Sequence, residues 1–490
     1  MGLVVLDLSL TMESSPGNGR MVEDGVVSFS DGHGLENRAL VHRVTRCLAV
    51  FELLNPTTVL QWSEVLRDFR IILRDRTAYS GRAVVKNLLH TGLTTLCEAT
   101  LEDAWVDLDH AAAACEASRV REELDRFLRE WHKSYRILPE YKIVVADLQT
   151  LLTDLRRWLE EVELGLRASA AADRLQVEQD VLQAVGEPIV PVINGLFERF
   201  ERIASKLEDD QLPPHHAYMK RHLHPLMLAS PFASRTFHKP LGYAGDYEMV
   251  SMMARNPYEG STAFAKIMNL WFLRQPPAHA HRNRLVHLEE KLVAETARAA
   301  ARSRPARILN LACGPAIEIQ RFLTRKAYSD RASFVLVDFN EEALRHAQAA
   351  LEQIAAQNGR KLSAQYVRKS VQQILKEAGR TIERPVDQCY DLVYCAGLFD
   401  YLSDAVCRRI MSVLYGWLAP GGLLLTTNVD PLNPLRNGME HLLDWHLIYR
   451  NARQLYDLRP PQAPTAEATV RSDVTGVNLF LEVRKPGDAE

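Results

Sequence analysis

The stretch Arg307-Ile-Leu-Asn-Leu-Ala-Cys-Gly-Pro-Ala316 decides the fold of the C-terminal half of this 490-residue chain. Its apolar run predicts a buried strand that ends in a Cys-Gly-Pro turn, and residues 317–326 predict a helix. A second apolar run, Ser333-Phe-Val-Leu-Val-Asp-Phe-Asn340, then ends on one acidic residue, Asp338. This order is typical of a nucleotide-cofactor site, because a carboxylate at the end of the second strand can accept both ribose hydroxyls.

The residues of the turn distinguish between cofactors. Dinucleotide sites use three glycines, but here Gly314 is flanked by Ala312 and Ala316, which disfavours a diphosphate ligand. A strand followed by Cys313-Gly-Pro315 resembles the first motif of class I S-adenosylmethionine-dependent methyltransferases, whose cofactor carries no phosphate. An ordinary strand-to-helix turn of a parallel sheet is the alternative for this motif alone.

Four further elements follow in the order expected of that class. Tyr390–Cys395 predicts a buried strand, residues 396–401 a loop over the sheet edge, and Pro420-Gly-Gly422 a turn between a helix and the strand 423–428. Residues 468–470 and 475–483 predict a closing antiparallel hairpin. The sequence therefore predicts an α/β fold, the doubly wound Rossmann-like sheet of a class I methyltransferase. Another doubly wound domain is the alternative.

Composition limits the remaining possibilities. Hydrophobic residues make up 47% and charged residues 25% of the chain, which is typical of globular proteins with two to four domains at this length. A net charge of −3 favours no nucleic-acid partner, and no apolar run is long enough to cross a membrane, so a cytoplasmic location is expected. The seven cysteines form no Cys-x-x-Cys pair, so neither disulfides nor a metal site are predicted.

The N-terminal half divides into three predicted regions. Residues 1–35 are rich in turn residues and predict a disordered tail, and short alternating runs over 36–110 predict a small antiparallel β-barrel. Residues 111–235 predict helices, with Pro139 separating two apolar stripes. These stripes must be buried either against the other domains or against a second copy of the chain, so homodimerisation through the helices is a hypothesis. The methyltransferase domain is expected over 236–490.

The predicted barrel resembles a PilZ domain, the module that binds cyclic di-GMP through arginines and a later Asp-x-Ser-x-x-Gly strand. The match is degenerate, because His42-Arg-Val-Thr-Arg46 has its arginines at the wrong spacing and Leu89 replaces the serine in Asn87–Gly92. A structural or partner-docking barrel is therefore expected, with cyclic di-GMP binding as the alternative.

The segment Phe237–Met249 has an unusual composition for a connector. It holds two glycines, two tyrosines, a histidine, a lysine and two acids before the helix predicted from Leu285, with Arg282 and Arg284 just ahead of that helix. In class I methyltransferases the segment before the first strand folds over the cofactor as a lid. Simple packing of Tyr243 and Tyr247 is the alternative.

The chain also resembles a more specific family. His238–Glu248, the Cys313–Ala316 turn, Gly397–Tyr401, Asn428–Pro431 and Thr475–Phe480 are similar to the bacterial 3-hydroxypalmitic acid methyl ester synthases, or PhcB-like methyltransferases. The resemblance implies methyl transfer from S-adenosyl-L-methionine to the carboxylate of a 3-hydroxy fatty acid, giving a quorum-sensing methyl ester and S-adenosyl-L-homocysteine. The small-molecule acceptor itself is not fixed by such a resemblance.

Site residues are expected in two groups. Those expected to face the acceptor or serve catalysis are His238, Tyr243, Asp246, Tyr247 and Tyr401. Those expected at the cofactor are Asn310, Leu311, Ala312, Cys313, Gly314, Asp338, Phe339, Ser370, Val371, Cys395 and Arg282. Arg282 would pair with the cofactor carboxylate, and Cys313 and Cys395 would be packing residues. The run from Met439 to Arg450 either lines an acyl channel or covers the sheet as an amphipathic helix.

Two other functions stay open. An amine, hydroxamate or other heteroatom acceptor would need a base to take its proton, for which His238 or Asp246 is the candidate. A non-catalytic protein that senses S-adenosylmethionine or a nucleotide is the third hypothesis.

Overall fold

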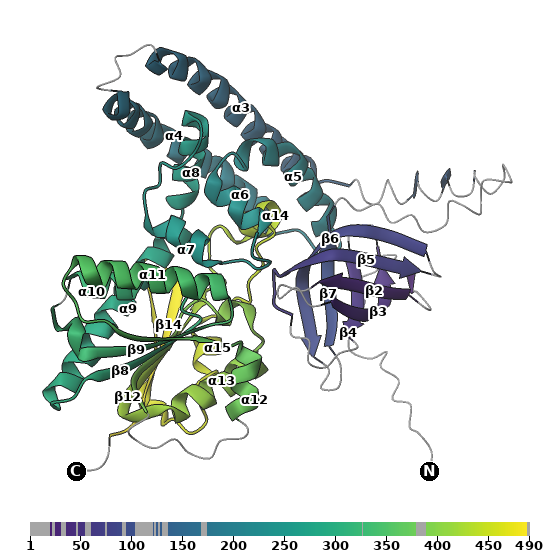
Figure 1. The fold of residues 1–490 in the computed structure, drawn as a ribbon. Helices are drawn as coiled ribbons and strands as arrows, with labels where there is room; N and C mark the ends of the chain where they lie inside the picture. The colour runs from purple at the N-terminus through teal and green to yellow at the C-terminus, as the bar shows by residue number, and fades with distance from the viewer. Residues whose placement is uncertain are drawn as a thin grey trace, which may run out of the picture. The chain divides into compact units, whose positions relative to one another are not determined.

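A computed structural model gives the fold of residues 20–21, 25–30, 36–45, 48–53, 60–73, 76–90, 95–102, 136–167, 174–325, 327–378 and 389–487, with positions 121, 124, 125, 128 and 129. The chain divides into two compact units (Figure 1). Unit 1 comprises Met1–Leu60, Glu64–Thr150 and Glu198–Pro225, and unit 2 comprises Gln61–Ser63, Leu151–Phe197 and Leu226–Glu490.

Unit 1 contains the predicted antiparallel barrel. Strands β2 to β7 form a closed ring of neighbours, and the pairing of β3 with β4 completes it. The rings of Phe29, Phe51 and Phe69 meet at its centre, with centroids 5.6 to 6.1 Å apart. The strands are β1 (Arg20–Met21), β2 (Gly25–Ser30), β3 (Glu36–Val44), β4 (Leu48–Leu53), β5 (Val65–Leu73), β6 (Arg76–His90) and β7 (Thr95–Leu101).

The barrel starts earlier than the sequence predicted. Strand β2 lies inside residues 1–35, which were expected to be a disordered tail, so that prediction is wrong for Gly25–Ser30. Val27 is fully buried and Phe29 is 2% exposed, because these alternate residues face the barrel core. The alternation is short and lies between turn-rich segments, which explains why it was overlooked.

Helices precede the methyltransferase sheet, as predicted. They are α3 (Pro139–Arg167), α4 (Arg174–Ala204) and α5 (Leu212–Met227). Pro139 is the first residue of α3, a position where its missing N–H costs nothing. In unit 1 the Tyr141 hydroxyl donates to the His215 carbonyl at 3.0 Å. The first of the two predicted apolar stripes, which precedes Pro139, falls mostly outside the described residues.

Unit 2 is built on a seven-stranded sheet with the order β10-β9-β8-β11-β12-β14-β13. The first five strands are parallel, and β14 runs antiparallel to both β12 and β13, so the predicted closing hairpin is present. The strands are β8 (Ala306–Leu311), β9 (Ala332–Asp338), β10 (Ser363–Arg368), β11 (Tyr390–Cys395), β12 (Leu418–Val429), β13 (Ala468–Ser472) and β14 (Asn478–Arg484).

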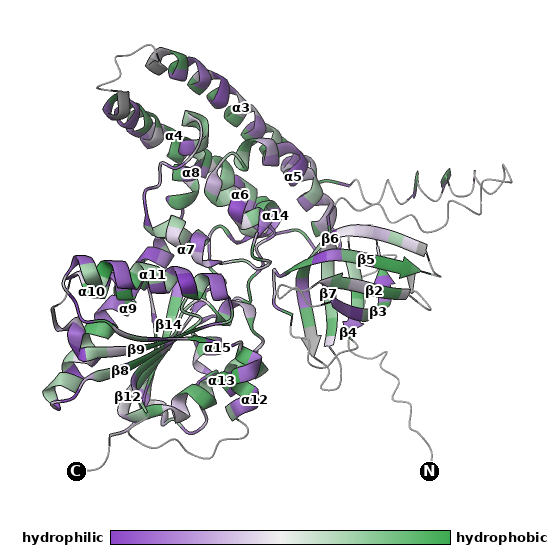
Figure 2. Ribbon diagram, in the orientation of Figure 1, coloured by the Kyte–Doolittle hydropathy of each residue, from purple (hydrophilic) through white to green (hydrophobic). Residues whose placement is uncertain are grey.

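Helices cover both faces of this sheet, which makes it doubly wound (Figure 1). One face packs against α9 (Pro276–Ala301), α10 (Ile317–Arg325) and α11 (Glu341–Gln357), and the other packs against α12 (Val371–Ala378), α13 (Asp404–Gly416) and α15 (Ala452–Tyr456). All six residues of β11 are buried, as expected for a strand covered on both sides. Figure 2 shows much of the neighbouring strand β12 in the green of hydrophobic residues.

The remaining helices of unit 2 are α6 (Pro231–His238), α7 (Tyr247–Ala254), α8 (Ala263–Leu273) and α14 (Arg436–Leu443). None of the helices within the described residues is both long enough and apolar enough to pass through a membrane.

Candidate cofactor and acceptor site

The turn after β8 leaves open space in front of its backbone. Ala312, Gly314 and Ala316 have positive φ angles of 56°, 50° and 51°, a conformation that side chains larger than alanine rarely adopt. A Cβ placed on Gly314 would meet no atom within 4 Å. A ligand can therefore approach the main chain at Gly314 closely.

Asp338, the last residue of β9, holds this turn in place. Its carboxylate accepts hydrogen bonds from the backbone N–H groups of Gly314 at 3.0 Å and Asn340 at 2.9 Å. Asp338 is only 6% exposed, and its burial raises the pKa of the carboxyl group, against which these backbone donors act. Each carboxylate oxygen keeps a second lone pair, so the group can also accept from a ligand.

A cavity of about 210 Å³ opens at the carboxyl edge of the sheet, where β8 and β11 lie side by side and the strand order reverses. Its lining joins the turn and Asp338 to α7, α9, the loop after β11 and the segment after α14. This is the place where ligands of doubly wound sheets bind.

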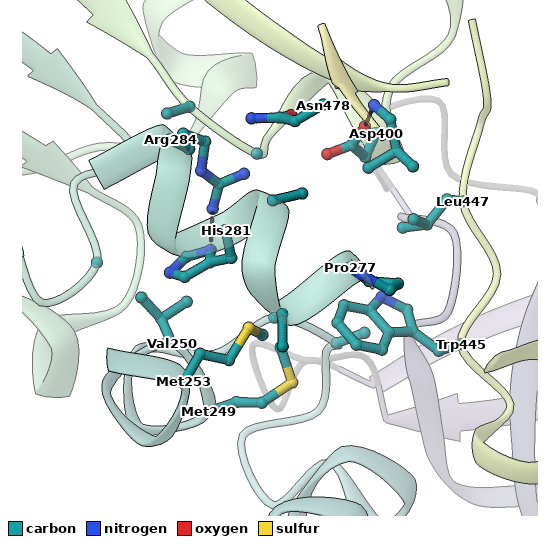
Figure 3. Close-up of a pocket in the computed structure, with 18 of the residues that line it drawn as sticks. Met249, Val250, Met253, Pro277, His281, Arg284, Asp400, Trp445, Leu447 and Asn478 are labelled. Atoms are coloured by element: carbon teal, nitrogen blue, oxygen red, sulfur yellow. Dashed lines mark hydrogen bonds between the residues drawn. The ribbon is translucent and has the colours of Figure 1, made fainter. Parts of the chain in front are cut away.

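Arg284 on α9 supplies positive charge to this cavity. Its Nη2 lies 2.7 Å from Nδ1 of His281, as Figure 3 shows. Burial and the neighbouring arginines lower the pKa of His281 well below its usual value, so the ring is neutral and accepts from the guanidinium. Gly397, where the loop after β11 passes this side chain, has a φ of 91°, which favours glycine, and a Cβ there would lie 3.0 Å from Arg284 Nη1.

A second polar cluster lies behind the turn. The buried Glu318 of α10 accepts from Asn310 Nδ2 at 3.0 Å and from the Tyr394 hydroxyl at 2.7 Å, both on Oε1. Burial raises the pKa of Glu318, while Tyr394 and Arg284 lower it. Asn310 is thereby fixed in orientation at the end of β8.

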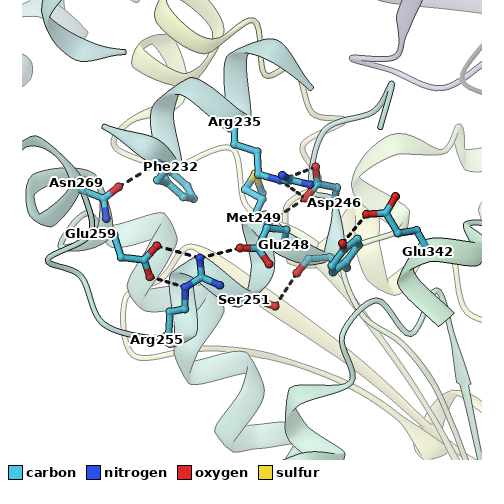
Figure 4. A network of polar contacts seen from close by, with 11 residues as sticks. Phe232, Arg235, Asp246, Glu248, Met249, Ser251, Arg255, Glu259, Asn269 and Glu342 are labelled. Carbon is cyan, nitrogen blue, oxygen red and sulfur yellow. Dashed lines mark hydrogen bonds and ion pairs between the residues drawn. The ribbon is translucent and has the colours of Figure 1, made fainter. Parts of the chain in front are cut away.

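The segment between α6 and α7, which the sequence predicted to be a lid, contributes Tyr243, Ala244 and Gly245 to the cavity lining. The Tyr243 ring packs against Phe339, the residue after Asp338, with centroids 4.9 Å apart. The Tyr247 hydroxyl donates to Glu342 of α11 at 2.6 Å (Figure 4). Lys239, at φ 45°, donates from Nζ to the carbonyls of Leu443 and Asp444 at 3.2 and 2.9 Å.

The far side of the cavity is apolar. Met249, Val250 and Met253 of α7 face it together with Leu447, as Figure 3 shows. Further apolar lining comes from Phe232, Trp271, Phe272, Leu442 and Leu443. We call Met249, Val250, Met253 and Leu447 the apolar wall. Trp445 beside it donates from Nε1 to the Tyr401 hydroxyl at 2.9 Å.

Nine of the predicted site residues line the cavity. They are Tyr243, Tyr247, Tyr401, Asn310, Ala312, Cys313, Gly314, Asp338 and Phe339. The structure thus brings the lid tyrosines, the turn and the acidic residue of β9 into one place.

The other predicted residues lie elsewhere. The exposed His238 side chain contacts the carbonyl of Ser234 at 2.8 Å, and Asp246 caps α7 while pairing with Arg235 at 2.9 Å (Figure 4). Leu311 and Cys395 belong to the core on one face of the sheet, and burial raises the pKa of Cys395. Ser370 immediately precedes α12 and Val371 begins it, and neither residue lines the cavity.

Arg282 is occupied by the backbone. Its guanidinium donates to the carbonyls of Met253 at 3.1 Å and Leu273 at 2.8 Å, and it is not among the cavity-lining residues. Arg284, two positions later, lines the cavity instead.

Sequence reasoning assigned no role to several polar cavity residues, among them Asp400 and Asn478. Asp400 follows β11 and Asn478 begins β14, so both stand at the sheet edge where functional residues of such folds gather. The position of Asp400 after a predicted strand was a usable signal. Asn478 lies within Thr475–Phe480, one of the segments that carry the family resemblance, but a single asparagine in a hairpin is common and did not by itself indicate a site residue.

Comparison with known proteins agrees with this geometry. Residues 308–422 match the family model described as Methyltransferase domain. A search of curated proteins finds no match.

Among solved structures, a possible exported protein from Bordetella parapertussis is 19% identical, with 59% of this chain and 95% of that chain covered at a TM-score of 0.42. The magnesium protoporphyrin IX methyltransferase of Synechocystis with bound S-adenosylhomocysteine is 11% identical, with 42% and 84% covered at 0.29. The N-methyltransferase NodS of Bradyrhizobium japonicum is 14% identical, with 49% and 98% covered at 0.29. These low similarities do not bear on the acceptor.

The fold, the turn and the matched domain define a class I methyltransferase. The protein is an S-adenosyl-L-methionine-dependent enzyme of that class, and S-adenosyl-L-homocysteine is the product of its cofactor.

Proposed function

We propose that the enzyme methylates a carboxylate oxygen of a small apolar acid, such as a 3-hydroxy fatty acid. The observation that supports this most is the continuity of one cavity, which joins the cofactor turn to the apolar wall. An alkyl chain buried against methionine and leucine side chains is favoured by about 0.8 kcal/mol per CH₂ group. Methionine adapts its shape to flexible chains.

The residues of the turn fit S-adenosylmethionine. We assign Asp338 to the ribose hydroxyls, Phe339 to the adenine and Asn310 to Gly314 to the methionine part, next to the open space at Gly314. Arg284 takes the role predicted for Arg282, pairing with the cofactor carboxylate, because only Arg284 lines the cavity. When bound, the cofactor supplies a methyl group on a positively charged sulfur.

This chemistry needs little from the protein beyond placement. A fatty carboxylate is ionised near neutral pH and needs no general base. The lid and the apolar wall must exclude water and hold the oxygen within about 3 to 3.5 Å of the methyl carbon. Arg284 contributes positive charge that offsets the cost of removing a carboxylate from water.

One observation favours a different acceptor. Asp400 lines the cavity, and burial raises the pKa of its carboxyl group to about 6 despite the N–H of Val429 and the arginines nearby. A carboxylate with that pKa suits a general base for an amine or hydroxyl acceptor. His238 and Asp246, the bases considered from sequence, lie outside the cavity lining.

Product analysis would separate these functions. Calorimetry with S-adenosylmethionine would be followed by release of S-adenosylhomocysteine with hexadecanoic acid, 3-hydroxyhexadecanoic acid and hexadecylamine. The proposal expects methyl esters of the acids in mass spectra and no methylated amine. Methylated amine without ester would favour the second function, and cofactor binding without turnover of any acceptor would favour the sensing protein.

The finer expectations for the N-terminal half remain proposals. We favour partner docking over cyclic di-GMP binding for the barrel, on the arginine spacing in His42–Arg46, and calorimetry with cyclic di-GMP would test it.

A homodimer through α3 is supported by Trp158 and Leu164, which are 50% and 65% exposed. Light scattering that gave a monomer mass at micromolar concentration would dispose of the dimer. We keep the cytoplasm as the proposed location.

A further inference from the structure

Two polar side chains with free hydrogen-bonding capacity line the same cavity. They are Asn478 and Asp400, both labelled in Figure 3. They are joined through Val429 at the end of β12. Asn478 is the strand partner of Val429, and the Val429 N–H donates to Asp400 Oδ1 at 2.7 Å.

The amide of Asn478 lacks a partner that its burial calls for. Its side chain is 3% exposed, and Nδ2 has no hydrogen bond to any described residue. A buried donor left unpaired costs about 1 to 3 kcal/mol, so native proteins nearly always satisfy such groups. Because Asn478 lines the cavity, a ligand atom that accepts a hydrogen bond can satisfy it.

Asp400 offers the complementary acceptor. It is 4% exposed, and the bond from Val429 occupies Oδ1. Its other oxygen, Oδ2, accepts no hydrogen bond from the part of the chain that the structure describes. The two side chains together therefore present one donor and one acceptor to the same ligand group.

We propose that Asn478 and Asp400 recognise a hydroxyl group of the acyl acceptor, close to its reacting carboxylate. This rests on the proposed function and narrows the acceptor to hydroxylated acids. A hydroxyl oxygen accepts from Asn478 Nδ2 while its proton is donated to Asp400. A carboxylate has no proton for Asp400, and an ammonium group has no lone pair for Asn478.

The hydrogen bonds that Asn478 and Asp400 make to the hydroxyl group distinguish hydroxylated acids from other acids. An acid without the hydroxyl leaves the Asn478 amide unpaired inside the cavity and binds more weakly for that reason. The apolar wall accepts the alkyl chain in either case. Selection between acids therefore depends on this pair rather than on chain length alone.

The test compares hexadecanoic, 2-hydroxyhexadecanoic and 3-hydroxyhexadecanoic acids on the full chain. Methyl-ester formation gives kcat/KM, and calorimetry with S-adenosylhomocysteine present gives binding. We expect the unchanged enzyme to prefer one hydroxy acid over hexadecanoic acid by about tenfold or more in both measurements. Asn478→Leu should reduce that preference to within about twofold.

Two more variants sharpen the result. Thr426→Val removes a buried and equally unpaired hydroxyl on β12 that does not line the cavity, and should keep the preference. Asp400→Asn should weaken the preference, because Val429 fixes the amide oxygen and turns the new NH₂ group toward the cavity.

Each contrary result has a distinct meaning. Equal treatment of the three acids by the unchanged enzyme, or a preference that survives in Asn478→Leu, overturns the inference. The inference is also overturned if the Asp400→Asn enzyme binds all three acids normally but methylates none of them. Asp400 would then act in the methyl-transfer step and not in recognition of the hydroxyl. Selective binding without any ester would reject carboxylate methylation while supporting hydroxyl recognition. Absence of binding by every acid would reject both.

Discussion

The Tyr247 hydroxyl donates a 2.6 Å hydrogen bond to the carboxylate of Glu342, which joins the first turn of α7 to the first turn of α11. Helix α11 begins three residues after Asp338. The bond therefore links the lid to the strand end that holds the cofactor turn. We expect the position of the predicted lid and the geometry of the proposed cofactor site to be coupled through this contact.

Tyr247→Phe should loosen the lid and weaken cofactor binding. The group is partly exposed, so we expect a loss of about threefold to tenfold in affinity for S-adenosylmethionine, in line with one hydrogen bond. Calorimetry measures the change. Ser251→Ala, which removes a bond from the same helix to the Tyr247 carbonyl, is the control and should bind normally. Equal affinities for the phenylalanine variant and the unchanged enzyme would argue against a closing role for this contact.

Gly314→Ala should impair cofactor binding far more than stability. The positive φ of 50° costs the alanine variant about 1 kcal/mol, and its methyl group enters the open space assigned to the ligand. Gly359→Ala is a matched control, with φ 61° and open space but no place in the cavity. Thermal unfolding should show similar losses for both, while calorimetry should show weakened cofactor binding for Gly314→Ala alone. Comparable cofactor affinities in the two variants would contradict the assignment of this turn.

Arg284→Met and Arg282→Met should separate binding from structure. Loss of Arg284 removes the positive charge of the cavity, and we expect affinity for S-adenosylmethionine to fall about tenfold or more. Loss of Arg282 leaves the carbonyls of Met253 and Leu273 without this donor, so it should lower the melting temperature with a smaller effect on affinity. If Arg282→Met instead caused the larger loss of affinity and Arg284→Met the larger loss of melting temperature, the cofactor carboxylate would be assigned to Arg282.

Asp400→Asn should stabilise the protein in a pH-dependent way. The folded pKa of Asp400 is raised from 3.8 to about 6, so its contribution to stability is fully present below pH 3.8 and is lost as pH rises to about 6. Asparagine does not ionise, so the Asp400→Asn protein does not lose this stability as the pH rises. We expect a gain of up to about 3 kcal/mol in unfolding free energy at pH 8 that shrinks below pH 6. Denaturant unfolding at pH 8 and pH 5 measures this gain in unfolding free energy. A gain that is the same at both pH values would show that burial does not raise the pKa of Asp400.

Arg450→Met should be strongly destabilising. This side chain is 2% exposed and donates to the carbonyls of Phe399 and Leu402, to Asn428 Oδ1 and to Asp404, at 2.6 to 2.9 Å. Methionine fills the space but leaves buried acceptors unpaired, at a cost of about 3 to 5 kcal/mol. Arg450→Lys should recover part of it. These bonds hold the loop that carries Asp400 and Tyr401. A melting temperature of Arg450→Met close to that of the unchanged protein would contradict this structural role of Arg450.

The sheet and its turn could be predicted because their signals are local. An apolar run, small turn residues and an acidic strand end stand within 33 residues of each other, from Ala306 to Asp338. The first barrel strand was missed because its alternation spans only Gly25–Ser30. Short strands gain their identity from pairing with distant segments, which a single sequence does not reveal.

The sequence could not predict which of Arg282 and Arg284 lines the cavity, and the reason is geometric. Two positions along an α-helix differ by about 200° in direction, so only one of these arginines can face the cavity. The sequence placed both arginines just ahead of a helix predicted from Leu285, whereas α9 already begins at Pro276 and contains them both. His238 and Asp246 failed to reach the cavity for a related reason, because one ends α6 and the other caps α7.

Strand β14 is the last strand along the chain, yet it lies in the interior of the sheet between β12 and β13. On the ribosome, β12 therefore keeps an unpaired edge until residues 478–484 have left the exit tunnel. The nascent chain also lacks Asn478 until that moment, so it has no complete cavity to offer a ligand. Full ligand occupancy must consequently follow the emergence of β14, and until then the open edge of β12 can pair with other exposed strands.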